Sequence, residues 1–181
     1  EDLEKSSFAS AADYAEETAT HKAIDVATKC MQEQELPDLV IGKHLRFARL
    51  AFCSRLLFLK RCMGGPCAAA GADTVVDLEG RVLEKPSDEA DARRMLAELQ
   101  GRQHQVHTGV ALILPKAIDP VLGKAPLVRS FSETTRVSFA PLTETTIAAY
   151  VATKEPMDKA GAYGIQVRCR CWVFLRYTSL C

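Results

Sequence analysis

The sequence predicts an α/β domain, because segments with helical periodicity alternate along the chain with segments of strand character. Three segments repeat apolar residues at helical spacing, at residues 11–34, 88–100 and 144–153. Between them lie apolar or alternating runs of strand length, at residues 39–42, 72–78, 106–114 and 127–139. Of the 181 residues 48% are apolar, which is enough to form one buried core.

Each predicted helix begins after a side chain that can accept a hydrogen bond from the first-turn amides. The expected caps are Ser10, Ser87 and Thr143, and Gly101 is expected to end the second helix. The apolar residues place one buried face on each helix. The first face comprises Ala15, Ala19, Ala23, Val26, Ala27 and Cys30, the second Ala92, Met95, Leu96 and Leu99, and the third Ile147, Tyr150 and Val151.

Two strands are expected in the second half of the chain. Residues 106–114 form a continuous apolar run of strand length. Residues 115–126, with three prolines and a glycine, form a loop. Residues 127–139 alternate in places, which puts Val137 and Phe139 on one side of a strand.

The composition favours a soluble intracellular protein, which we place in the cytoplasm. Lys and Arg number 23, as do Asp and Glu, so the formal net charge is zero. No apolar run approaches the roughly 18 residues needed to span a bilayer, and no signal peptide opens the chain. We therefore expect neither a membrane nor a nucleic acid as partner.

Two segments differ sharply from the rest of the chain in charge and cysteine content. Residues 43–71 and 167–181 contain nine of the 23 Lys and Arg residues but none of the 23 Asp and Glu. They also contain six of the seven cysteines, with only Cys30 outside them. Such a shift in composition predicts domain boundaries at the ends of the two segments. We assign residues 1–166 to one domain that is interrupted by a non-native insertion at residues 43–71, and residues 167–181 to an unrelated basic tail.

Residues 43–71 divide a predicted strand whose two halves are Leu39–Gly42 and Ala72–Leu78. Deleting them would give the continuous sequence Val-Ile-Gly-Ala-Asp-Thr. The genetic code allows a good splice donor at Gly42-Lys43 and a good acceptor at Ala70-Gly71. Our hypothesis is that both unusual segments are translated intron sequence.

Other interpretations of the two segments stay open. Their cysteines could bind zinc, although the spacing lacks a paired C-x-x-C. The run Leu45–Leu59 could form a basic amphipathic helix on a membrane or a nucleic acid. A disordered or loosely packed insertion is a further alternative, and a reducing compartment disfavours disulfides.

Residues 155–166 combine two acids, a lysine, an amide and two glycines in a segment too irregular for a regular helix or strand. Pro156 cannot donate a backbone hydrogen bond, and the glycines allow backbone shapes that other residues avoid. Such loops place charged groups around a small polar ligand, although a solvated surface loop is the alternative. A second polar cluster at residues 71–76, followed by Glu84-Lys85-Pro86, favours the functional interpretation.

Together these motifs resemble the Maf family of nucleoside triphosphate pyrophosphatases. The matching pieces span most of residues 5–166 and are Lys22-Ala23, Gly71–Val76, Glu84–Pro86, Asp91–Leu96, His107–Val110, Glu133–Thr135 and Glu155–Gln166. Ser7–Ala9 and Glu17–Ala19 look closest to the Maf-like domain of eukaryotic acetylserotonin O-methyltransferase-like proteins. The resemblance implies a homodimer with a Maf/ITPase-like mixed sheet flanked by helices, incomplete here and with a foreign basic insertion.

The implied reaction converts dTTP, UTP or a modified pyrimidine nucleotide to its monophosphate and diphosphate. Asp73 follows an apolar strand, so we expect it at the strand end, facing a cleft. The resemblance makes it the proton acceptor, and its carboxylate suits Mg or Mn. The resemblance also implies substrate binding by Lys22, Thr74, Lys85, Lys159 and Gln166, and metal binding by Asp73, Glu155 and Asp158.

Simpler roles are open for some of these residues. Lys22 could lay its aliphatic stem over the core with its ammonium in water. Glu155, Asp158 and Lys159 could form a solvated charge cluster. His107 is expected to be structural, because nothing near it in sequence marks it as a base.

The sequence departs from the family at both ends. The family's opening loop Ser-x-Ser-Pro-Arg-Arg, which contributes phosphate-binding arginines, is absent, and so are the strand and helix that follow position 166. We therefore expect this chain to fold poorly or to be nearly inactive. The competing function is a non-catalytic regulatory or dimerisation module that retains the fold.

Overall fold

The computed structural model describes residues 3–32, 39–41, 68–114, 123, 127–164 and 173–174. Its helices are α1 (Ala11–Gln32), α3 (Glu89–Leu99) and α4 (Glu144–Ala152), with short 3-10 turns at Lys5–Ser7, Glu155–Asp158 and Ala160–Ala162. Its strands are β1 (Leu39–Ile41), β2 (Ala68–Leu78), β3 (Arg81–Leu83), β4 (Gln103–Leu114), β5 (Leu127–Phe139) and β6 (Val173–Phe174).

The strands form one mixed sheet, as the resemblance implied. The order is β1-β2-β4-β5-β6, and β3 pairs with β2 outside this path. Strand β1 runs parallel to β2, whereas β3 is antiparallel to β2 and β6 is antiparallel to β5. The predicted α/β class is therefore confirmed.

The chain divides into two compact units, and strands β2, β4 and β5 contribute residues to both. The first unit comprises Glu1–Asp73 and Thr108–Glu133. The second comprises Thr74–His107 and Thr134–Cys181. Among the described residues, no helix is both long and apolar enough to cross a membrane.

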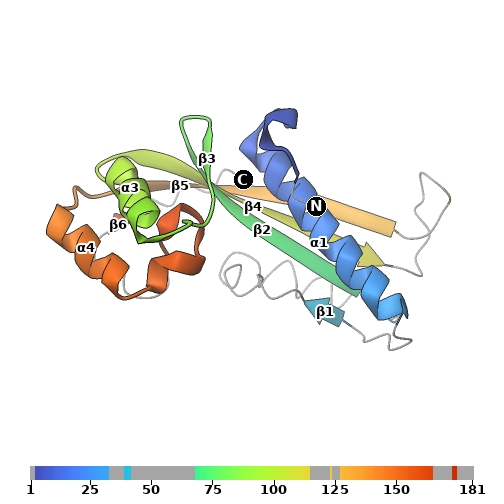
Figure 1. Cartoon of the computed structure of the whole chain (residues 1–181). Helices are drawn as coiled ribbons and strands as arrows, with labels where there is room; N and C mark the ends of the chain where they lie inside the picture. The colour runs from blue at the N-terminus through green and yellow to red at the C-terminus, as the bar shows by residue number, and fades with distance from the viewer. Residues whose placement is uncertain are drawn as a thin grey trace. The chain divides into compact units, whose positions relative to one another are not determined.

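In the first unit, α1 lies along the sheet (Figure 1). Small residues let it approach the strands closely. Its buried alanines form a cluster with β4 that comprises Ala19, Ala23, Ala27, Ala111 and Ile113. A Cβ atom at Gly71 of β2 would lie only 2.2 Å from the carbonyl oxygen of Ala19. A Cβ atom at Gly109 of β4 would lie 2.2 Å from the carbonyl oxygen of Ala15. The helix therefore lies nearer to the strands than any side chain on them would permit.

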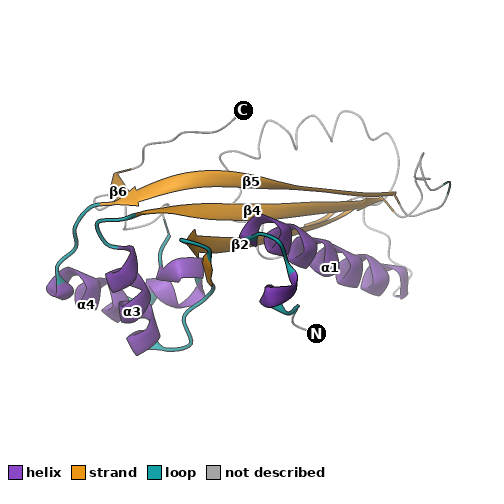
Figure 2. Ribbon diagram, turned by 90° about the horizontal axis from the view of Figure 1, so that it is seen from above, coloured by secondary structure: helices purple, strands orange, loops and turns teal. Residues whose placement is uncertain are grey.

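In the second unit, α3 and α4 lie side by side and cover one face of the sheet (Figure 2). The core of this unit is formed by the helices, the strands and the loop after α4. It comprises Val76, Leu78, Leu83, Ala92, Met95, Leu96, Leu99, Val137, Phe139, Ile147, Tyr150, Val151, Ala162 and Tyr163. The apolar residues predicted for the second and third helices are all buried. The predicted faces of these helices are therefore confirmed.

Two of the three predicted helix caps are confirmed. The Ser10 hydroxyl accepts from the Asp13 amide at 3.2 Å, and the Thr143 hydroxyl accepts from the amide of Thr146 at 3.2 Å. The predicted cap Ser87 is wrong, because Asp88 caps α3 by accepting from the Asp91 amide at 2.8 Å. A carboxylate in this position also interacts favourably with the positive end of the helix dipole.

The second strand begins earlier than predicted. Strand β2 starts at Ala68 and runs without interruption through Leu78. Residues 68–71 of the predicted insertion therefore belong to the sheet, where Ala68–Ala70 pair with β1. The predicted tail also contributes, since Val173–Phe174 of β6 pair with the end of β5.

Candidate active site

Lys22 and Asp73 form an ion pair in the first unit. Asp73 lies two residues after Gly71, so strand alternation puts both on the face of β2 that α1 covers. Lys22 of α1 precedes the buried Ala23, and its Nζ donates to Asp73 Oδ1 at 2.5 Å. The Lys22 side chain is 40% exposed and that of Asp73 is 18% exposed. Solvent can therefore reach the pair from the lysine side.

The position of Asp73 differs from the prediction in one respect. The carboxylate was expected at the end of its strand, but β2 continues from Asp73 to Leu78. Neither role weighed for Lys22 included a salt bridge to Asp73. The arrangement places a carboxylate able to accept a proton beside a cation able to bind an anion.

Lys159 holds the first turn of the loop at residues 155–164 in the second unit. Its Nζ donates to the backbone oxygen of Glu155 at 2.7 Å and to Asp158 Oδ1 at 2.5 Å. The Lys159 side chain is 10% exposed, whereas that of Asp158 is 75% exposed. The hydrogen bond from Lys159 lowers the pKa of Asp158, and the charge of Lys85 adds a smaller effect in the same direction.

Tyr150 links the two ends of this loop. Its hydroxyl donates to Glu155 Oε1 at 3.3 Å and accepts from the amide of Gly164 at 3.3 Å. Tyr150 lies in α4 and is 3% exposed, so the bridge is anchored in the core. The Glu155 carboxylate is thereby held by a buried side chain of α4.

Gly161 attaches the same loop to the Glu84-Lys85-Pro86 motif. Its amide donates to the backbone oxygen of Glu84 at 3.0 Å. Gly161 has a φ of +66°, and a Cβ atom there would lie 2.8 Å from Cγ2 of Val76. The expectation that glycine gives this loop an unusual backbone is confirmed at this position.

The predicted site residues fall into two groups. Lys22 and Asp73 belong to the first unit, and the other described site residues, Thr74, Lys85, Glu155, Asp158 and Lys159, belong to the second. Thr74 is half-buried in β2, and Lys85 is exposed after β3. Gln166 lies outside the described residues, as do the cysteines weighed as zinc ligands.

Carboxylates are the donors that a hard cation such as Mg²⁺ would use in this site. Within the described ranges, no three His, Cys, Asp or Glu side chains gather into one group that could hold a metal ion. Mg²⁺ nevertheless commonly binds through one or two carboxylates together with water and substrate phosphates. The single carboxylate of Asp73 fits that mode.

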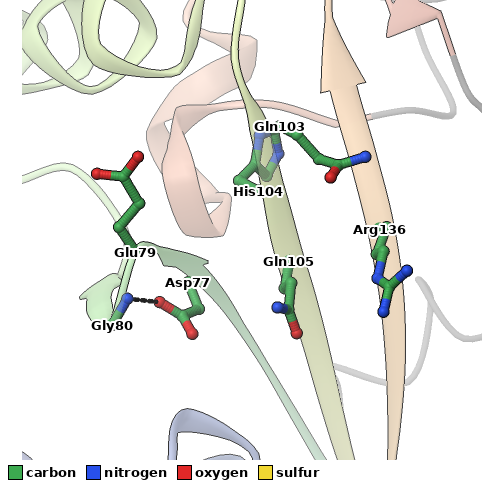
Figure 3. A pocket seen from close by; sticks show the side chains of 7 residues that line it. All are labelled: Asp77, Glu79, Gly80, Gln103, His104, Gln105 and Arg136. Atoms are coloured by element: carbon green, nitrogen blue, oxygen red, sulfur yellow. Dashed lines mark hydrogen bonds between the residues drawn. The ribbon is translucent and has the colours of Figure 1, made fainter.

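A shallow depression of about 180 Å³ lies elsewhere in the second unit (Figure 3). It is lined by Asp77, Glu79, Gly80, Gln103, His104, Gln105 and Arg136, none of which was predicted to belong to a site. In Figure 3, Gln103, Gln105 and Arg136 project from neighbouring strands, and Asp77 accepts from the Gly80 amide at 2.7 Å. The lining mixes both charges and carries no reactive pair, so we assign it no catalytic role.

Two buried histidines support the second unit. The ring Nε2 of His104 lies 2.7 Å from the Tyr163 hydroxyl, and burial lowers the pKa of His104 to about 4. In His107, Nδ1 lies 2.9 Å from the Thr134 hydroxyl and Nε2 lies 3.7 Å from Asp77 Oδ2. The sequence indicated no role for His104, and its structural role is evident only from its burial and its contact with Tyr163.

Comparison with known proteins identifies the family of the chain. The profile described as "Maf-like protein" matches residues 1–178. A human "Probable bifunctional dTTP/UTP pyrophosphatase/methyltransferase protein" is 41% identical over 167 residues, which cover 92% of this chain and 22% of the human protein. A "dTTP/UTP pyrophosphatase" of Bacillus cereus (strain AH820) is 53% identical over 96 residues, which cover 53% of this chain and 45% of that protein.

The chain spans less than half the length of these curated relatives. The family match nevertheless covers nearly the whole chain, and the mixed sheet is the architecture that the sequence motifs implied. This chain belongs to the Maf-like protein family.

Proposed function

We propose that the chain is a cytoplasmic nucleoside triphosphate pyrophosphatase for dTTP, UTP or modified pyrimidine nucleotides. The observation that carries the proposal is the ion pair between Lys22 and Asp73. It joins a proton acceptor to a cation that can bind phosphate, and both groups stand in motifs shared with the family. The printed names of the human and Bacillus relatives support this substrate class.

Hydrolysis requires water to attack phosphorus while the bond to the leaving diphosphate breaks. In our proposal Asp73 accepts the proton of the attacking water. The products are the nucleoside monophosphate and diphosphate, which contain every atom of the triphosphate and the water.

The lysines offset the charge of the triphosphate. Lys22 would leave Asp73 for a phosphate oxygen when substrate binds, which frees the carboxylate to act. Lys85 and Lys159 would bind further phosphate oxygens as point charges. Thr74 and Gln166 would recognise the pyrimidine edge through a hydroxyl and an amide.

We further propose a divalent cation, Mg or Mn, as cofactor. Asp73 would hold it through its single carboxylate, with water and substrate phosphates as the other ligands, because oxygen atoms are the ligands that these hard ions prefer. Glu155 and Asp158, the other two predicted ligands, do not gather with Asp73 into one metal group among the described residues. When bound, the ion would offset charge on the phosphates. Asp158 is ion-paired with Lys159 in the structure, so metal binding there would compete with that lysine.

The test is diphosphate release from dTTP and UTP by the purified chain, with Mg or Mn present. Such release would also overturn the expectation that this chain is nearly inactive. Asp73→Asn should abolish release, whereas Asp25→Asn, at an exposed position of α1, should leave it unchanged. Equal turnover by the wild-type chain and Asp73→Asn would refute the proposal. Nucleotide binding without any turnover would favour the non-catalytic module instead.

We also propose that the active form is a homodimer, which the family resemblance implies. Light scattering on the purified chain should give twice the monomer mass of 19.8 kDa. A monomer that releases diphosphate would contradict the dimer while leaving the activity proposal intact.

A further inference from the structure

We propose that residues 39–42 and 68–71 are alternative first halves of the same strand. In a chain without residues 43–71, Leu39–Gly42 would take the place of Ala68–Gly71 and continue directly into Asp73. This inference treats residues 43–71 as an insertion within the Maf-like domain. It concerns folding and does not depend on the proposed activity.

The pairing register of β1 and β2 is the first observation that supports the exchange. Strand β1 runs parallel to β2, with Leu39 opposite Ala68, Val40 opposite Ala69 and Ile41 opposite Ala70. Each β1 residue thus lies beside the residue whose place it would take. The exchange needs a sideways shift of one strand spacing, about 4.8 Å, and no slip along the strand.

The need for glycine at position 71 is the second observation that supports the exchange. Gly71 has no space for a side chain, because a Cβ atom would lie 2.7 Å from the Ala23 amide as well as against Ala19. The residue that follows Ile41 is Gly42, just as Gly71 follows Ala70. In the same register, the shortened chain would therefore place a glycine where α1 demands one.

Strand propensity favours the exchange. Leu39-Val40-Ile41 consists of apolar residues, two of them β-branched, whereas Ala68-Ala69-Ala70 consists of residues that are depleted in strands. The position of Asp73 relative to the glycine is the same in both chains. The ion pair to Lys22 should therefore persist.

One position makes the exchange demanding. Ala70 is 1% exposed, so Ile41 would bring three more carbon atoms into a buried place. The variant Ile41→Ala in the shortened chain restores alanine there. It therefore measures whether the larger side chain fits.

The experiment compares thermal unfolding of the full chain with that of two deletion variants. Deleting residues 43–71 should give a cooperative transition with a Tm at least equal to that of the full chain. Deleting residues 43–70 keeps both Gly42 and Gly71 and shifts Leu39–Ile41 by one residue, which reverses the faces of the strand. The Tm of this second variant should be lower than that of the variant without residues 43–71 by at least about 5 °C. Equal Tm values for the two deletions, or loss of cooperative unfolding in the first, would overturn the proposal.

Glycine substitutions then test the site of exchange. In the full chain Gly71→Ala should lower the Tm and Gly42→Ala should have a much smaller effect. In the chain without residues 43–71, Gly42→Ala should become as damaging as Gly71→Ala is in the full chain. Tolerance of Gly42→Ala in that shortened chain would show that Gly42 does not lie under α1.

Discussion

Lys22 Nζ lies 2.5 Å from Asp73 Oδ1, which joins the middle of a helix to the interior of a strand 51 residues further along the chain. Gly71, two residues before Asp73 in β2, lets the helix approach the strand. Because part of the lysine side chain is exposed, solvent screens the attraction and the pair contributes less than about 1 kcal/mol to folding stability. Its importance should therefore appear in activity rather than in stability.

Lys22→Met should separate these two effects. We expect kcat/KM for dTTP to fall at least about 100-fold, because a cation that stabilises transition-state charge is lost. The free energy of unfolding should change by less than about 1 kcal/mol. Steady-state kinetics and urea unfolding measure the two quantities. A fall in activity that merely follows a large loss of stability would contradict the proposed role, and Lys22→Arg serves as the charge-conserving control.

Gly161→Ala should destabilise the second unit for two reasons. Its φ of +66° is unfavourable for alanine, and the new Cβ atom would lie 2.8 Å from Val76 Cγ2. Gly101→Ala is the matched control, since Gly101 has a φ of +65° and nothing within 4 Å of the added atom.

The control should lose about 1 kcal/mol of stability from backbone strain alone. Gly161→Ala should lose at least about 1 kcal/mol more, because Val76 must move. Denaturant unfolding of the two variants measures the difference. Equal losses would mean that the loop relaxes away from Val76 at no cost.

Tyr150→Phe removes one hydroxyl from a buried bridge while it keeps the aromatic packing. The Gly164 amide and the Glu155 carboxylate each lose a hydrogen bond, so stability should fall by about 1–3 kcal/mol. Hydrogen exchange at the Gly164 amide should accelerate by more than the global loss of stability explains. Unchanged exchange at Gly164 would show that the hydroxyl does not hold the loop.

His104 should make the fold sensitive to mild acid. Burial lowers its pKa to about 4, whereas an unfolded histidine titrates near 6.5. Between these values the unfolded state binds more protons, so the contribution is complete above pH 6.5 and is lost as pH falls towards 4. Each pH unit in this window should cost up to about 1.4 kcal/mol.

His104→Gln should flatten this part of the stability profile while it keeps a polar group near Tyr163. Urea unfolding at several pH values between 4 and 7 measures the slope for both proteins. A slope that is the same in the wild-type chain and in His104→Gln would assign the acid sensitivity to other groups.

Much of the fold follows from neighbours in sequence. The caps at Ser10 and Thr143 were predictable, because each accepts a hydrogen bond from an amide three residues later. Ser87 was a wrong choice for the same local reason, since Asp88 beside it can cap as well and the sequence did not rank the two. Burial of the apolar faces of α3 and α4 followed from helical spacing alone, whereas Val26 of the predicted face on α1 is only partly buried.

The candidate site was predictable in its members but not in its contacts. Motif resemblance named Asp73, Lys22 and the charged loop, and the sequence placed none of them beside another. The structure pairs Lys22 with Asp73, pairs Lys159 with Asp158, and leaves Gln166 outside the described residues. These pairings remain consistent with the proposed chemistry, which stays a prediction until turnover is measured.

The sequence by itself determined the class of the fold, the faces of its helices and the family to which the chain belongs, since these depend on spacing and on residues a few positions apart. Only the tertiary structure decided that Lys22 pairs with Asp73 and that Gly71 lies under α1. The physical reason is distance along the chain. Contacts between α1 and β2 join residues about fifty positions apart, and only packing of the helix on the sheet brings them together.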